Sequence, residues 1–236
     1  MLYFEYQNSS FKSLIKRLTE MKALSIFRIV AALISIPFAT MALADTNKLS
    51  INGDTVVYDT NLAKAEEDQE INWDDADALE ALLRKNPDVK VLHLESYGGL
   101  TAAAMHISDV VIDYELDTYV DGECSSSCVT IFLAGEKRTL ARGAWLGFHK
   151  TSWDSGSMRD YYESEKENEG WSNPFEFAEW VFDDTQDEIL KDFEYMLERG
   201  VTPSFAIKTL RADSDDMWYP RRKELVSAGV VNDVSN

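Results

Sequence analysis

Between residues 89 and 149 the chain alternates between short apolar runs and segments with helical spacing. Strands and helices that alternate in this way form a mainly parallel sheet, because each helix crosses one face of the sheet and returns the chain in the same direction. Strands are expected at 89–96, at 117–122 and in the run that ends at His149, with helices at 100–114 and 124–135. The alternation therefore predicts an α/β fold with a mainly parallel sheet.

The segments before this region fit the same class. The stretch "KLSINGDTVVYD", residues 48–59, predicts two short strands joined by an Asn-Gly turn. The stretch "DDADALEALLRKNPD", residues 74–88, carries apolar residues three and four apart. It predicts an amphipathic helix that is capped by Asp74 or Asp75 and ended by the Asn-Pro pair.

The C-terminal third reads as mostly helical. Residues 175–200 have the spacing of a long amphipathic helix, and residues 151–175 before it are polar and aromatic with two glycines. We expect residues 151–175 to form a long inserted loop. Further helices and a short closing strand are expected in 201–236.

Residues 1–44 are typical of a secretory signal peptide. Lys22 and Arg28 precede a 15-residue apolar run that ends in Ala-Leu-Ala. A membrane span needs about 20 apolar residues, so an uncleaved anchor is the weaker alternative and would be the only membrane contact. We expect cleavage after Ala44, which leaves 45–236 as one exported domain, with residues 1–20 as an upstream extension.

The exported part is strongly acidic. Residues 1–44 hold five basic and two acidic residues of the chain's 23 and 42, which leaves 18 basic and 40 acidic residues in the remainder. Such a surface repels nucleic acid, because binding a polyanion requires cations that replace its counterions. These charges also serve to keep an exported protein soluble.

Two turns rich in small residues follow predicted strands. Gly99 ends "SYGG" after the run 89–96, and "CSSSC" begins the apolar segment 124–135. A serine at such a turn can attack a carbonyl carbon, and nearby backbone amides can hold the resulting oxyanion. His149, at the end of a predicted strand, is the best placed base, and the acidic loop "DSDDM" offers Asp213, Asp215 and Asp216 to orient it.

These residues carry a resemblance to the Clp peptidase proteolytic subunit (ClpP) and its relatives in the crotonase superfamily. "LESYGGLTAAAM", "GECSSSCVTIFLAG" and "KRTLARGAWLGFH" resemble the family's glycine turn, nucleophile segment and histidine segment, and "DDMWYPRRKELVSAGVV" resembles its aspartate loop. The resemblance implies Ser126 as nucleophile, His149 as base and Asp216 as the orienting acid, with Asp215 still open. It also implies that the amides of Gly99 and Ser127 form the oxyanion hole.

The resemblance further implies stacked ββα units of the ClpP/crotonase type, a C-terminal helical arm and a homo-oligomer. It implies a Ser-His-Asp peptidase that needs no cofactor or metal. The chain departs from ClpP around the nucleophile, where Ser-Ser-Ser-Cys replaces Ala-Ser-Met-Gly, and in the longer stretch from His149 to Gly200. Together with the signal peptide, this makes it similar to exported bacterial ClpP-like hydrolases, which act on peptides or unfolded proteins without ATP.

Cys124 and Cys128 are the chain's two cysteines. A metal site needs more ligands than these two residues supply. Residues four apart on a helix lie within disulfide range, and export favours an oxidised pair. Two buried thiols fit the sequence equally well, and a cysteine nucleophile is a weaker third alternative.

Alternatives to the catalytic roles stay open from the sequence. Ser126 can be a small core residue, His149 a surface histidine and Lys150 a base of the Ser-Lys type. Four tryptophans can line a groove or pack in the core: Trp153, Trp171, Trp180 and Trp218. At the level of function the alternatives are a non-catalytic secreted binding protein on the same fold and a crotonase-like acyl-thioester enzyme.

Overall fold

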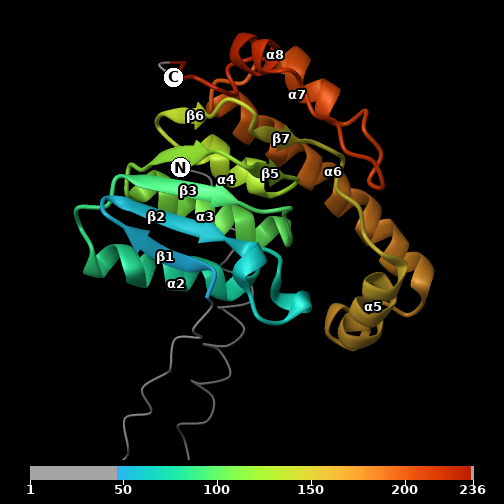
Figure 1. Cartoon of the computed structure of the whole chain (residues 1–236). Helices are drawn as coiled ribbons and strands as arrows, with labels where there is room; N and C mark the ends of the chain where they lie inside the picture. The colour runs from blue at the N-terminus through green and yellow to red at the C-terminus, as the bar shows by residue number, and fades with distance from the viewer. Residues whose placement is uncertain (1–46, 235–236) are drawn as a thin grey trace, which may run out of the picture. The chain divides into compact units, whose positions relative to one another are not determined.

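A computed structural model describes residues 47–234 (Figure 1). The strands are β1 (Leu49–Asn52), β2 (Thr55–Asp59), β3 (Val91–Glu95), β4 (Asp117–Val120), β5 (Glu123–Ser125), β6 (Arg138–Leu140) and β7 (Trp145–Gly147). The larger sheet has the order β1-β2-β3-β4-β6, in which β1 is antiparallel to β2 and the other pairs are parallel. A smaller sheet pairs β5 with β7 in parallel. The predicted α/β class with a mainly parallel sheet is confirmed.

Helices cover one face of the larger sheet. The helices are α2 (Trp73–Lys85), α3 (Thr101–Asp113), α4 (Cys128–Ala134), α5 (Ser155–Glu169), α6 (Pro174–Glu198), α7 (Pro203–Thr209) and α8 (Arg222–Ser227). Figure 1 shows α2, α3 and α4 behind the sheet. In β2 and β3 every second side chain is buried, namely Val56, Tyr58, Leu92 and Leu94. This alternation places one sheet face in the core, because successive side chains of a strand point to opposite faces.

The two sheets meet at the carboxyl end of β3. Ser96 forms a parallel bridge with Cys124, so β5 runs beside the continuation of β3. The amide of Ser125 donates to Ser96 O at 3.0 Å. The turn that follows β3 and the turn that follows β5 therefore lie at the same edge, where parallel α/β folds gather functional residues.

The expected helix at 124–135 is wrong in its first turn. Cys124 belongs to β5, and α4 begins only at Cys128. Ser126 between them has a φ of 57°. A left-handed residue ends a strand sharply and cannot belong to a right-handed helix. The sequence motif is therefore strand, turn and helix.

The expected loop at 151–175 is also wrong, because it contains α5. Asp154 caps α5 by accepting hydrogen bonds from the amides of Gly156 and Ser157. Aromatic side chains of α5 pack against α6 and the connection between the two helices, as in the pairs of Tyr161 with Trp171 and with Trp180. This aromatic packing stabilises a polar helix that sequence periodicity alone does not reveal.

The cap of α2 differs from the predicted one. Asn72 is the N-cap, and its side chain accepts from the amide of Asp74. Asp75 completes a capping box, because its carboxylate accepts from the amide of Asn72 at 2.9 Å. The cap therefore lies two residues before the first aspartate that the sequence offered.

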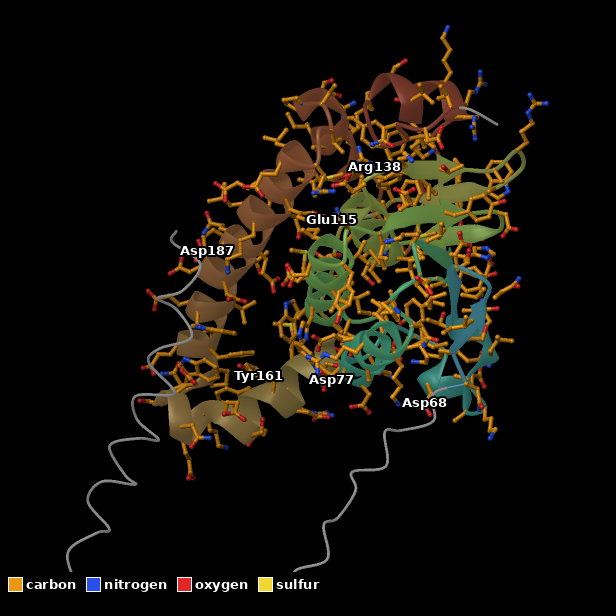
Figure 2. The ribbon with its side chains drawn as sticks, turned by 90° about the vertical axis from the view of Figure 1, so that its left-hand side faces the viewer. Asp68, Asp77, Glu115, Arg138, Tyr161 and Asp187 are labelled. Atoms are coloured by element: carbon orange, nitrogen blue, oxygen red, sulfur yellow. A yellow bond between two sulfur atoms is a disulfide. The ribbon has the colours of Figure 1, made fainter. Side chains whose placement is uncertain are left out.

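The C-terminal end of α6 is tied to the body of the fold. The Tyr195 hydroxyl donates to Thr130 O at 2.9 Å, and Arg199 donates to Leu133 O and Ala134 O. Arg138, labelled in Figure 2, is buried and donates to Arg199 O and Val230 O. Burial, together with the nearby Arg199, lowers the pKa of Arg138 to about 10. These contacts fix α6 alongside α4.

The predicted signal peptide, its cleavage site after Ala44 and the extension at 1–20 lie outside the described residues. Within residues 47–234 no helix is both long and apolar enough to cross a membrane.

Candidate active site

Ser126 occupies the sharp turn between β5 and α4. Its φ of 57° lies in the left-handed region, which a residue with a side chain adopts at a cost of about 1–3 kcal/mol. The turn is held because the amide of Ser126 donates to Gly147 O at 2.9 Å. The side chain of Ser126 is half-buried. A strained turn of this kind presents the hydroxyl at the edge of the sheet.

His149 contacts this hydroxyl directly. The distance between His149 Nε2 and Ser126 Oγ is 2.7 Å, which is a good hydrogen bond. The backbone around His149 is fixed on both sides, because Phe148 and Trp218 exchange two hydrogen bonds of 2.9 Å and the amide of Lys150 donates to Ala212 O. The two residues that the sequence singled out as nucleophile and base are thus brought together.

The third member of the predicted triad is not brought into contact with His149. The Nδ1 atom of His149 is buried and has no hydrogen-bond partner in the described part of the chain. Asp216 is exposed and accepts from the amide of Met217 at 2.8 Å. Asp213 is paired with Lys150 at 2.6 Å. The acid of the triad, whether Asp216 or Asp215, stays a prediction.

The loop that carries these acids nevertheless lies beside the histidine. The bonds of Lys150 to Ala212 and of Phe148 to Trp218 leave residues 213–217 as a loop across from His149. At the base of this loop, the Met217 side chain packs closely against Gly147. The loop is therefore anchored on both sides of His149, and none of its carboxylates is bonded to the imidazole.

Gly98 and Gly99 form the turn after β3 and border Ser126. Their φ values are 107° and 152°, which favour glycine. A Cβ atom on Gly98 would lie 2.7 Å from the Cβ of Ser126, so no larger residue fits there. The hydroxyl of Ser127 donates to Gly99 O at 3.1 Å, which joins the two turns.

The amides of Gly99 and Ser127 were expected to form an oxyanion hole. Within residues 47–234 neither N–H donates to an acceptor, whereas the neighbouring Gly98 amide donates to Ser96 Oγ. Unsatisfied N–H groups in a partly buried turn are costly unless a ligand or solvent uses them. Both amides therefore lack a protein acceptor among the described residues, and their role in an oxyanion hole stays a prediction.

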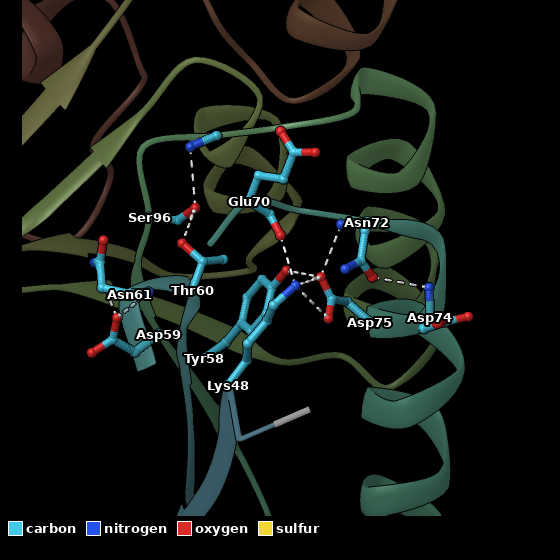
Figure 3. A network of polar contacts seen from close by, with 11 residues as sticks. Lys48, Tyr58, Asp59, Thr60, Asn61, Glu70, Asn72, Asp74, Asp75 and Ser96 are labelled. Atoms are coloured by element: carbon cyan, nitrogen blue, oxygen red, sulfur yellow. Dashed lines mark hydrogen bonds and ion pairs between the residues drawn. The ribbon is translucent and has the colours of Figure 1, made fainter. Parts of the chain in front are cut away.

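A buried polar network supports the glycine turn from below (Figure 3). The backbone of Ile71 clamps the turn, since its N–H donates to Gly98 O and its carbonyl accepts from Leu100. Lys48 holds Glu70, the residue before Ile71, because its Nζ donates to Glu70 O at 2.7 Å. Lys48 is almost fully buried. The network thus reaches from the start of the described chain to the glycine turn.

Asp75 is the charge partner in this network. Lys48 Nζ lies 3.0 Å from Asp75 Oδ2, and the hydroxyl of Tyr58 donates to the same oxygen at 2.6 Å. Burial, followed by the charge of Asp75, raises the pKa of Tyr58 far above its usual value. Sequence reasoning missed this network, because a lysine in a polar segment gives no sign that it is buried.

A disulfide brackets the nucleophile. Cys124 and Cys128 are bonded, with Cα atoms 5.3 Å apart, and both are buried. Because Cys124 lies in β5 and Cys128 begins α4, the bond links the two elements between which Ser126 is held. The sequence left a disulfide and free thiols equally open, and its helical argument for the pairing was wrong in geometry.

A cavity of about 100 Å³ opens beside Ser126 and His149. Its walls come from α4, the residues after β7 and the second half of α6. The tryptophans lie elsewhere or in the core: Trp218 packs on Phe148 and Phe205, while Trp153, Trp171 and Trp180 belong to the aromatic packing at α5. No group of three or more potential metal ligands occurs among the described residues.

Neither a protein-family model nor a curated protein sequence matches this chain. Among solved structures, a mutant form of ClpP1 from Listeria monocytogenes is similar with a TM-score of 0.48 and 19% sequence identity. The match covers 69% of this chain and 85% of that chain. At this level of similarity the alignment says nothing of activity.

Proposed function

We propose that the protein is a serine hydrolase in which Ser126 is the nucleophile and His149 the general base. The observation that carries the proposal is the 2.7 Å contact between Ser126 Oγ and His149 Nε2. It occurs at a strained turn, where a nucleophile has to be presented to a substrate. The two unused amides of Gly99 and Ser127 supply the electrostatic stabilisation that acyl transfer requires.

The reaction follows from these positions. His149 Nε2 takes the proton of the Ser126 hydroxyl while Oγ attacks the scissile carbonyl carbon, and the oxyanion is held by the amides of Gly99 and Ser127. The imidazolium then gives this proton to the leaving group as the bond to the carbonyl carbon breaks. Water, deprotonated by His149, then attacks the acyl carbon; as its bond to Ser126 Oγ breaks, the imidazolium returns this proton to Oγ and the acid product leaves.

For this step His149 must carry its other proton on Nδ1. That atom is buried and unpartnered among the described residues, and the loop 213–217 lies across from it. We propose that Asp216 accepts the Nδ1 proton in a hydrogen bond when substrate or a neighbouring subunit reorders this loop, with Asp215 as the alternative. Catalytic hydrogen bonds are often long or absent without substrate and form in the complex.

The proposed substrates are peptides or unfolded proteins outside the cytoplasm, cleaved without ATP. The resemblance of the four sequence segments to ClpP supports peptide bonds as the target, and the predicted signal peptide supports export. Homo-oligomerisation is part of the proposal. Large apolar side chains of α6 that lie exposed support it: Phe175, Phe182 and Leu190.

A non-catalytic binding role on the same fold is the second candidate. The observation that favours it is the missing partner of His149 Nδ1, since an imidazole without an orienting acid is a poor base. A hydrolase turns over ester or amide substrates, whereas a non-catalytic binding protein does not.

The test is hydrolysis of fluorogenic esters and peptide amides by the exported domain. We expect turnover by the wild type and its loss in Ser126→Ala. The matched control is Ser125→Ala, because the Ser125 hydroxyl is committed to Glu123 at 2.8 Å. Turnover that survives in Ser126→Ala, or its absence in a folded wild type, contradicts the hydrolase proposal.

A further inference from the structure

The cavity beside the nucleophile is apolar on two sides. One wall is formed by Val129, Leu133 and Phe148, and the other by Ile189, Phe193 and Met196 of α6. Ser126 and His149 line the same cavity. A substrate whose carbonyl carbon is attacked by Ser126 therefore has this cavity next to it for one of its side chains.

One carboxylate interrupts the apolar wall. Asp192 lies on α6 between Ile189 and Phe193 and lines the cavity. It is half-buried, and it forms neither a hydrogen bond nor an ion pair with any residue of 47–234. Burial raises the pKa of Asp192, because the ionised form loses hydration. A bound cation would form an ion pair with Asp192 and replace the hydration that burial removes.

No lysine or arginine of residues 47–234 forms an ion pair with Asp192. Lys150 also lines the cavity, but its Nζ is paired with Asp213 at 2.6 Å. Along α6 the charge becomes more negative, because Glu188 lies one turn before Asp192 and has its own pKa raised by burial and by the neighbouring acids. Asp192 is therefore the one carboxylate in the lining of this cavity, and no cation of the described residues is paired with it.

We propose that this cavity binds a basic side chain, so that Asp192 makes the enzyme prefer Lys or Arg as the residue whose carbonyl Ser126 attacks. The apolar walls suit the aliphatic stem of such a side chain, and the carboxylate suits its cationic end. A side chain of the same length without charge would cover the half-buried Asp192 and leave it unpaired. This inference rests on the proposed hydrolase function and names the substrates of the same site.

The kinetic test uses fluorogenic peptide amides that differ only in the residue before the scissile bond, which is Lys, norleucine or Glu. Since a hydrogen bond to a charged group is worth more than a neutral one, we expect kcat/KM for Lys to exceed that for norleucine by about 10- to 100-fold. Asp192→Asn should abolish this preference, and Asp192→Lys should shift it toward Glu. The matched control is Asp187→Asn on the same helix (Figure 2), a residue that does not line the cavity.

A binding measurement keeps this inference separate from catalysis. Fluorescent peptides that end in Lys or norleucine are titrated into Ser126→Ala protein, and their anisotropy gives the affinity. We expect the Lys peptide to bind at least 10-fold more tightly, and the difference to vanish in the double variant with Asp192→Asn. Equal or reversed affinities overturn the cavity assignment whether or not the wild type hydrolyses anything. If the wild type shows no turnover while Ser126→Ala protein still binds the Lys peptide more tightly, only the proposed hydrolase function is overturned.

Discussion

At the scale of single residues, the site contains a hydrogen-bonded pair of nucleophile and base, but no acid is bonded to that base. Ser126 and His149 lie at hydrogen-bond distance, and the backbone conformation of Ser126 is strained. His149 Nδ1, in contrast, is buried without a partner among the described residues. A buried polar atom that lacks a hydrogen bond costs about 1–3 kcal/mol and marks a position where a further group is expected.

The acid of the triad can be identified by single substitutions in the loop across from His149. We expect Asp216→Asn to lower kcat by about two to four orders of magnitude, because the imidazole then loses its orientation and its compensating charge. The KM value should change little, since Asp216 does not line the cavity. Asp215→Asn is the paired control, and steady-state kinetics of both variants provide the measurement.

A larger loss in Asp215→Asn than in Asp216→Asn would assign the role to Asp215. Equal activity of both variants and the wild type would contradict a loop carboxylate in this role.

At the scale of elements, the site is a junction of two turns, each held by a separate device. The glycine turn is clamped by Ile71, which the buried Lys48–Asp75 pair supports. The serine turn is bracketed by the disulfide between β5 and α4. Both turns are thus held by residues that do not line the cavity beside Ser126.

Removing the disulfide should affect activity more than folding. Cys124 and Cys128 enclose a loop of only five residues, so the chain-entropy estimate of its stabilisation is about 2 kcal/mol. We expect the double variant Cys124→Ala/Cys128→Ala to fold, with Tm lowered by a few degrees and kcat lowered at least 10-fold, because Ser126 loses its fixed turn. Thermal unfolding and kinetics on the same preparation check this.

The wild type treated with a reductant should behave like the double variant. Full activity of the reduced protein would show that the turn keeps its geometry without the bond.

At the scale of the whole molecule, the order of strands and helices was predictable and the tertiary support of the site was not. The order β3, α3, β4, α4 and β7 follows from local hydrophobic pattern, which did not reveal β5 and β6, and the pair of Ser126 with His149 follows from motif spacing. The burial of Lys48 and the position of Asp192 depend on contacts distant in sequence, which no local pattern encodes. Helix α5 was missed for the same reason, since its aromatic partners lie largely on α6 and on the connection to it.

Stability should rise as the pH falls from 8 toward 5. Burial is the first cause that raises the pKa of four carboxyl groups, which are Glu95, Asp109, Glu188 and Asp192. A carboxyl group whose pKa is higher in the folded state takes up its proton there before it does in the unfolded state. The folded state is therefore favoured as the pH falls through the raised pKa values, and the effect ends near the ordinary carboxyl pKa of about 4.

Urea unfolding at several pH values measures this trend, and Asp192→Asn should flatten it in part while raising stability at pH 8. A free energy of unfolding that decreases steadily from pH 8 to pH 5 would contradict the burial of these carboxylates.

The central claim is that Ser126, activated by His149, is the nucleophile of a hydrolase. Its most direct test is reaction of residues 45–236 with a fluorophosphonate probe, followed by peptide mass mapping. The account predicts a single adduct on Ser126, absent in Ser126→Ala and strongly reduced in His149→Ala, with Ser125→Ala labelled like the wild type. A folded wild type that forms no adduct, or an adduct that persists in Ser126→Ala, would contradict it.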